Sequence, residues 1–254
     1  MSTVLQLPRI AELTDAELEA MAPEEFAQAL LDKAALFGTD IMDSSKYRVR
    51  PMTPPERLEA LREWNRRHAW LEWWLGVPPP SKQLVLMPET EIALRVRLAQ
   101  QVVDEVKHQR VFSKLAQQLG GNPRFETYEP TQTLQAMYRS TFEFEPDDDP
   151  VLAIAASLQC TGEAVLMHHL KPGQSIATIT LDEPTIQSMT DDVVPDELRH
   201  VKNGADLMAR FARTAPQRRR AAQIQDAKLV VLVRHYVEDH AVVGGERAAP
   251  LPSI

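Results

Sequence analysis

Apolar residues recur every three or four positions along most of this chain, a spacing that places them on one face of an α-helix. The pattern predicts helices over residues 14–37, 54–76, 88–120, 130–142, 150–170, 183–213 and 216–241. Thr14 and Asp15 are suited to cap the first helix, and Pro88 to open the third. Strand-like sequence is confined to 176–180, so the pattern predicts an all-α fold.

Proline, glycine and polar residues separate these periodic segments. Residues 38–53 are expected to be irregular chain, and residues 77–80 to end a helix. Residues 145–150 are expected to form an acidic turn, and residues 171–180 a loop. Pro195 predicts a break or kink inside the segment 183–213, because proline lacks the amide donor that a helix interior needs. Residues 244–254 are expected to form a frayed tail.

The composition agrees with one helical domain over residues 1–254, with 44% hydrophobic, 25% charged and only 6% aromatic residues. A single cysteine excludes an internal disulfide framework and fits a reducing compartment. No apolar run is long enough to span a membrane or to form a signal peptide, so we expect a cytoplasmic protein without membrane partners. A net charge of −8 makes nucleic acid an unlikely main partner.

Two seven-residue segments, 104–110 and 196–202, follow nearly the same order: acid, glutamate, aliphatic, base, histidine, any residue, base. Each places a glutamate three positions before a histidine, so on a helix both side chains share one face. Two such helices facing each other present four ligands to a common point, as in four-helix bundles that hold two iron or manganese ions. The candidate ligands are Glu105, His108, Glu197 and His200.

A site of this kind needs one further glutamate on the helix before each Glu-x-x-His helix. Glu72 precedes Glu105 by 33 residues and Glu163 precedes Glu197 by 34, as two copies of one helix–loop–helix unit would give. Glu163 stands in an otherwise apolar helix, where a bridging metal ligand explains a carboxylate that would be costly if unpaired. We favour Glu72 as the remaining ligand, although Glu63 would match the depth of Glu105 in its helix better.

Asp104 and Asp196 are expected to accept hydrogen bonds from the ligand histidines in a crossed arrangement, Asp196 from His108 and Asp104 from His200. Aspartates that face solvent are the alternative. Carboxylate oxygen with imidazole nitrogen suits iron and manganese, and the lack of thiolates argues against structural zinc or an iron–sulfur cluster. The alternative for the whole pattern is a pair of solvated helices with ordinary surface charges.

Other residues receive simpler interpretations. His68 is expected to be a hydrogen-bonded core histidine and Cys160 a small buried hydrophobic residue. Four tryptophans between 64 and 74 indicate packing or an oligomer face, which leaves a homodimer open. The arginines at 218–220 indicate a solvated helix start or a docking patch for a partner.

The order Glu, Glu-x-x-His, Glu, Glu-x-x-His resembles that of the ferritin-like di-iron carboxylate superfamily, and Asp-Glu-x-Arg-His at 196–200 resembles its oxygen-activating branch. The resemblance implies a ferritin-like four-helix bundle over residues 54–213, with an N-terminal extension (1–53) and a C-terminal helix and tail (214–254). Residues 67–72 also resemble, over a short stretch, the first ligand helix of the tRNA hydroxylases. Val193 stands where some arylamine N-oxygenases carry an additional histidine, so the resemblance selects no subfamily. The matching positions are Glu72, Glu105, His108, Glu163, Glu197 and His200.

The resemblance implies a non-haem di-iron, O2-dependent oxidoreductase, a monooxygenase or oxidase that hydroxylates, N-oxygenates or desaturates a small organic substrate. Two iron ions, or iron with manganese, would be the cofactor. Because the chain has no nucleotide-binding glycine motif and no cysteine cluster, its electrons would come from an external ferredoxin or reductase. A tRNA hydroxylase of the same fold and a ferroxidase or iron-storage protein are the alternatives, and a metal-free helical scaffold is the remaining one.

Overall fold

The computed structural model describes residues 5–142, 144–169 and 174–254, and these are mostly helical, as the periodicity predicts. The longest helices are α2 (Pro23–Met42), α3 (Pro54–Leu71), α5 (Ile92–Gln118), α11 (Val194–Phe211) and α12 (Ala215–Val242). The shorter helices are α1 (Asp15–Ala20), α4 (Pro78–Leu86), α6 (Gln132–Phe142), α7 (Pro150–Ile154), α8 (Ala164–Leu166), α9 (Ala177–Thr180) and α10 (Glu183–Ser188). Three segments continue neighbouring helices with π-helical hydrogen bonding: Glu72–Gly76, Ala155–Glu163 and Met189–Val193.

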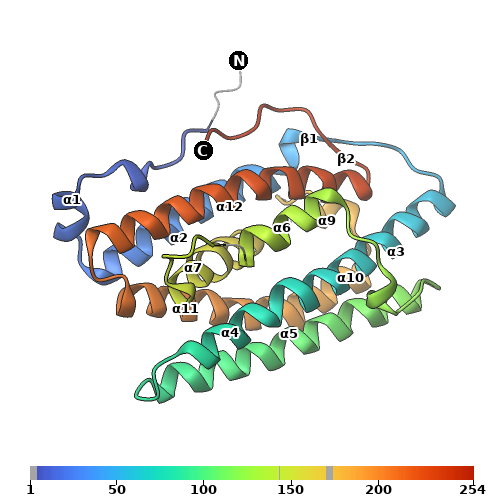
Figure 1. The fold of residues 1–254 in the computed structure, drawn as a ribbon. Helices are drawn as coiled ribbons and strands as arrows, with labels where there is room; N and C mark the ends of the chain where they lie inside the picture. The colour runs from blue at the N-terminus through green and yellow to red at the C-terminus, as the bar shows by residue number, and fades with distance from the viewer. Residues whose placement is uncertain (1–4, 143, 170–173) are drawn as a thin grey trace.

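The helices pack in two groups that meet at the middle of the molecule (Figure 1). Helix α5 lies along α3 and α4 on one side. On the other side, α2, α11 and α12 all pack against the π-helical segment Ala155–Glu163, and α6 lies on α12. Contacts between α5 and α11 join the two groups, so the two Glu-x-x-His segments lie on neighbouring helices.

Local sequence signals set most helix starts. Thr14, Thr53 and Thr214 each precede a helix and form a capping box with the residue three positions on, Glu17, Glu56 and Gln217 respectively. Prolines occupy the first turns of α3, α7, α11 and α12, where a missing amide hydrogen costs little.

Several predicted boundaries in the first half of the chain are wrong. The segment 14–37 forms two helices that break at Met21, and the second runs on to Met42 because its apolar face continues into the core. The proline run after residue 77 does not end helical structure, since its prolines open α4. Pro88 precedes its helix instead of starting it, because α5 begins at Ile92.

The second half also differs from prediction in places. Residues 177–180 form helix α9 and not a strand. The expected break near Pro195 is the π-helical segment Met189–Val193, and Pro195 itself lies in the first turn of α11. Strand β2 (Gly245–Arg247) pairs antiparallel with β1 (Tyr47–Val49), so the tail is held, and residues 38–53 are not wholly irregular. The predicted helix end at 170 and loop residues 171–173 lie outside the described residues.

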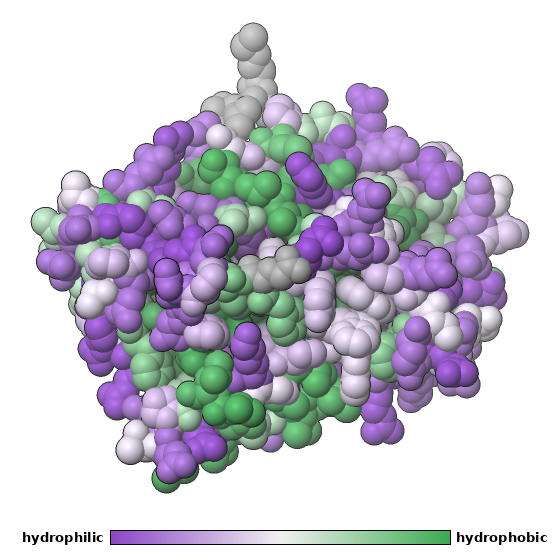
Figure 2. Space-filling model, in the orientation of Figure 1, coloured by the Kyte–Doolittle hydropathy of each residue, from purple (hydrophilic) through white to green (hydrophobic). Residues whose placement is uncertain are grey.

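Three clusters of buried apolar side chains fill the space between the helices, and they contain Phe26, Phe37 and Trp64 among their largest members. On the face drawn in Figure 2, hydrophilic residues surround smaller apolar patches. None of the helices formed by the described residues has the length and apolar character needed to cross a bilayer.

Candidate metal centre

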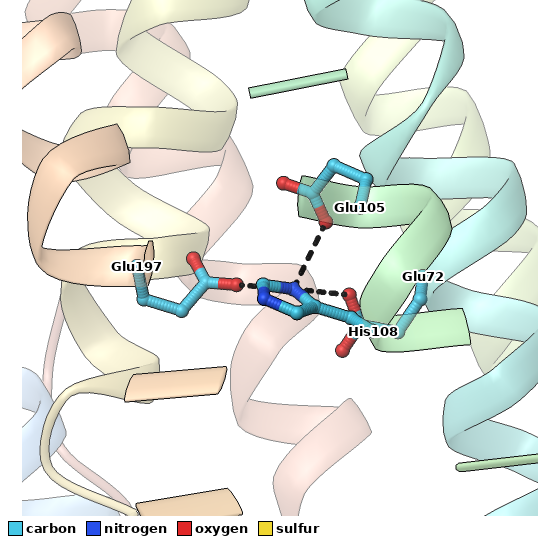
Figure 3. Close-up of side chains that lie close together, drawn as sticks. All are labelled: Glu72, Glu105, His108 and Glu197. Atoms are coloured by element: carbon cyan, nitrogen blue, oxygen red, sulfur yellow. Dashed lines mark ion pairs between the residues drawn. The ribbon is translucent and has the colours of Figure 1, made fainter. Parts of the chain in front are cut away.

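All six predicted ligands meet at one buried point between α3, α5, α11 and the segment Ala155–Glu163. Two of the glutamates lie on π-helical turns, which are frequent at functional sites because they rotate one side chain relative to a regular helix. Figure 3 shows Glu72, Glu105 and Glu197 directed at the ring of His108. The Glu72 side chain is 11% exposed, and those of Glu105 and Glu197 are 2% exposed.

The ligand atoms form two overlapping groups, and within each group all of them lie within 4.8 Å of one another. The first group is Glu72, Glu105, His108 and Glu197, and the second is Glu105, Glu163, Glu197 and His200. Glu105 and Glu197 therefore belong to both groups, whereas Glu163 belongs to one. The sequence suggested Glu163 as the bridging ligand. In the structure the glutamates that belong to both groups are instead those of the two Glu-x-x-His segments.

Each histidine directs its Nδ1 atom at the carboxylates. His108 Nδ1 lies 3.3 Å from Glu197 and 3.6 Å from Glu105. His200 Nδ1 lies 3.1 Å from Glu105, 3.4 Å from Glu197 and 3.9 Å from Glu163. Neither Nδ1 atom has a hydrogen-bond partner despite being buried. Such unpaired buried donor and acceptor atoms are rare and costly, and they require an explanation.

The opposite side of each ring makes the crossed hydrogen bond that the sequence predicts. His108 Nε2 lies 3.2 Å from Asp196, and His200 Nε2 lies 3.2 Å from Asp104. Burial opposes ionisation of both aspartates, but their histidine and Arg199 partners outweigh it and lower the pKa of each carboxyl. An ionised aspartate only accepts, so Nε2 of each histidine carries the hydrogen when the ring is neutral, and Nδ1 keeps a lone pair toward the glutamates.

Basic residues of the two motifs bond to these aspartates, although about half of each basic side chain is exposed. Lys107 Nζ donates to Asp196 at 3.2 Å, and Arg199 donates to Asp104 at 3.1 Å. The repeated order of acid, glutamate and base therefore has a structural meaning, because each motif supplies a base that reaches an aspartate of the pair.

Four glutamates in so small a volume need positive charge. Burial raises the pKa of Glu72 to about 8, with the neighbouring carboxylates adding to the shift, and burial raises the pKa of Glu163 well above its usual range. For Glu105, burial is outweighed by His108 and His200, which lower its pKa. The same carboxylates outweigh burial at His108 and His200 and raise the pKa of both rings. Protons on the imidazoles thus take the place that cations can fill.

The donor set fits a pair of metal ions. Besides the two Nδ1 atoms, one oxygen each of Glu105, Glu163 and Glu197 is buried without a hydrogen-bond partner. Carboxylate oxygens and imidazole nitrogens, in two groups that share two carboxylates, match the preference of iron and manganese.

Glu63 does not reach this point. Its side chain is 39% exposed and lies 3.9 Å from Arg66. Of the two alternatives, Glu72 and not Glu63 therefore lies at the cluster. Glu72 is the first residue of the π-helical segment Glu72–Gly76.

Two residues that sequence reasoning missed shape the cluster. Gln101 donates from Nε2 to Glu163 Oε1 at 2.8 Å, and it lies one turn before Glu105 on the same face of α5, so its spacing could have revealed it. Gly76 lies so close to Glu105 that a β-carbon there would be 2.4 Å from the Oε2 atom. That approach joins segments far apart in sequence, and no local pattern signals it.

The simpler interpretations had mixed outcomes. His68 donates from Nδ1 to the Trp64 carbonyl and Cys160 is fully buried, both as predicted. Trp64 is a core residue whose Nε1 atom donates to Asp239. The expectation of a solvated helix start or docking patch at 218–220 is wrong for Arg218, which is buried and donates to backbone carbonyls of three residues: Leu18, Met21 and Ala212. Arg219 and Arg220 are partly exposed and pair with Asp15 and Asp148.

A cavity of about 90 Å³ opens beside the cluster. Glu72, Glu105, Glu163 and Glu197 form part of its wall, and most of the rest is apolar. Room for a small molecule therefore exists directly next to the candidate ligands.

Comparisons of the chain with protein-family models, with curated proteins and with solved structures give no match. Functional inference therefore depends on the geometry of this centre and of the cavity beside it.

Proposed function

We propose that this chain is a di-iron carboxylate protein with a ferritin-like arrangement of its four ligand-bearing segments, and that it is an O2-dependent oxidoreductase acting on a small organic substrate. One observation carries the proposal: two buried ligand groups share Glu105 and Glu197 and leave both histidine Nδ1 atoms without partners. An all-helical scaffold without metal would have no reason to bury these unpaired groups together.

In this proposal Glu72, Glu105, His108 and Glu197 hold one ion, and Glu105, Glu163, Glu197 and His200 hold the other. Iron, or iron with manganese, fits these ligands. A bound pair supplies redox chemistry with O2 that amino-acid side chains lack.

The chain contributes orientation and a dry environment. Asp104 and Asp196 fix the tautomers of the two histidines, so each Nδ1 presents a lone pair. Leu71, Leu75 and Leu158 line the cavity next to the carboxylates and keep bulk water from the reacting bond.

In the monooxygenase version of the reaction, one oxygen atom of O2 enters a C–H or N–H bond of the substrate and the other leaves as water. Two electrons and two protons complete the balance. The described residues include no disulfide and one buried cysteine, so the electrons come from an external donor such as a ferredoxin or reductase.

Anaerobic loading with Fe(II) tests the proposal. We expect about two irons per chain, a coupled iron pair by Mössbauer spectroscopy, and O2 consumption on exposure to air. Glu105→Gln should lose both irons, and Glu63→Gln is the matched control on α3 that should keep them. Equal iron binding by the two variants would refute the proposed centre, and uptake of many irons per chain would favour storage.

A further inference from the structure

Lys228 on α12 is a buried cation that has no carboxylate partner among the described residues. Its ammonium group donates to Thr141 Oγ1 at 2.6 Å, Ser140 Oγ at 3.2 Å and the Met137 carbonyl at 3.3 Å, all neutral acceptors. Within the part of the chain that the structure describes, no acidic group lies within 4.0 Å of it. Lys228 is nevertheless only 1% exposed.

Two other buried cations are paired with carboxylates. Lys33 on α2 is equally buried and forms an ion pair with Asp226. Arg67 is buried against Glu238 and Asp239. A buried charge is stable only with an opposite charge or strong hydrogen bonds. Arg218 is also buried and donates to backbone carbonyls, but it does not line the cavity beside the glutamates, whereas Lys228 does.

Lys228 lines the same cavity as the carboxylate cluster. Lys228, Leu232 and Tyr236 all line it and are spaced four residues apart, so they form one stripe along α12, about 12 Å from first to last. Burial raises the pKa of Tyr236, and the charges of Asp239, Glu197 and Glu72 add to the shift. Of these acids, Glu197 and Glu72 line the cavity with Tyr236, so Tyr236 marks its glutamate end and Lys228 its cationic end.

The space between these ends is apolar and small. Leu71, Leu158, Leu166 and Leu232 contribute to its wall. A volume of about 90 Å³ is several times the roughly 10–15 Å³ that a cavity needs to admit one water molecule. A short hydrocarbon chain or a small ring fits this space, and a polar chain would lose its hydration there.

We propose that the cavity binds a small organic acid, with its carboxylate on Lys228 and its hydrocarbon end beside Glu72 and Glu163. The hydroxyls of Ser140 and Thr141 accept hydrogen bonds from the ammonium and hold it in place. Among the described residues that line the cavity, Lys228 is the only lysine or arginine, so the carboxylate of the ligand is drawn to that end. The role of this acid as the substrate rests on the proposed function. The binding of the acid in the cavity does not.

The ionisation of Lys228 is consistent with this role. Burial lowers the pKa of the Lys228 ammonium to about 7. A carboxylate arriving next to it would restore the charged form, because an opposite charge at close range favours ionisation.

Calorimetric titration of the metal-free protein tests the ligand class without depending on iron. The probes are hexanoate and hexan-1-ol, which share the hydrocarbon chain and differ in charge. We expect hexanoate to bind about 10- to 100-fold more tightly than hexan-1-ol, the range for a hydrogen bond to a charged group. Equal or weaker binding of hexanoate would overturn the proposal whatever the variants do.

Lys228→Met should remove the preference for hexanoate and leave the binding of hexan-1-ol nearly unchanged. Lys33→Met is the matched control, because it removes a buried ammonium that does not line the cavity. If both variants lower hexanoate affinity equally, the effect is structural and the proposal fails.

The same titration on iron-loaded protein separates the two hypotheses. Hexanoate binding that survives Lys228→Met only in the loaded protein would place the carboxylate on the metal and contradict the proposed orientation. A protein that binds no iron but still discriminates hexanoate from hexan-1-ol would refute the di-iron centre and leave the acid site standing.

Discussion

Gly76→Ala tests the candidate centre without removing any ligand. A β-carbon at residue 76 would lie 2.4 Å from Glu105 Oε2, 2.8 Å from Cδ and 3.0 Å from Cγ, whereas ordinary contact begins at 3.4 Å. The carboxylate oxygen must therefore retreat by about 1 Å, twice the roughly 0.5 Å within which a working constellation must be held. Because Glu105 belongs to both ligand groups, the shift would disturb both proposed ion sites.

The size of the effect follows from that displacement. Disturbing the contacts that hold a metal ligand in place typically lowers the affinity for the metal about 10- to 100-fold. This corresponds to about 1.4 to 2.7 kcal/mol. The metal-free protein should change little, because alanine gains about 1 kcal/mol over glycine in a helix and so offsets part of the steric cost. The variant thus separates metal affinity from folding.

Competition with a chelator measures the iron affinity of the variant, and thermal unfolding of metal-free and loaded protein measures stability. Gly162→Ala is the matched control, because Gly162 also lies in a π-helical segment that carries a candidate ligand, but a β-carbon there meets nothing closer than 3.7 Å. Iron binding by Gly76→Ala at the level of the control would show that Glu105 is not a shared ligand.

Three further predictions follow from the same geometry. Glu72→Ala should leave the group around His200 intact, so metal analysis should find about one iron per chain instead of two; loss of both irons would contradict the assignment of Glu72 to one group. Lys228→Met should be more stable than the parent below pH 7, by up to about 5 kcal/mol. This advantage should shrink as pH rises from about 7 toward 10.5, the ordinary pKa of a lysine, because the unfolded lysine binds a proton that the folded one has released. The cavity's carboxylates and histidines are common to both proteins, and a constant difference across pH in urea denaturation would refute this reasoning. Gly204→Ala should lower stability by about 1–3 kcal/mol, measured by thermal denaturation, because its β-carbon would lie 2.4 Å from Gln159 Cβ; an unchanged midpoint would show that α11 can move.

The candidate centre could be located from sequence because its elements are local. Glu105 with His108 and Glu197 with His200 lie one helical turn apart, so the regular geometry of a helix brings each pair together before any tertiary contact forms. The crossed contacts of Asp104 and Asp196 follow from the same spacing once two helices face each other.

Features that depend on contact between distant segments lay beyond the sequence. The cradle that Gly76 provides for Glu105, the assignment of the shared positions to Glu105 and Glu197, and the placement of Lys228 in the same cavity all require the packing of α3, α5 and α12. The tail was expected to fray because its residues lack periodicity, and only pairing with β1 holds it.

Sequence by itself therefore determined the helical class, the caps and the ligand pairs, because each depends on interactions within a few residues. Tertiary structure decided which glutamates fall in both ligand groups and which lysine lines the cavity beside them. These properties arise from distances between side chains on different helices, and no spacing along one helix encodes them.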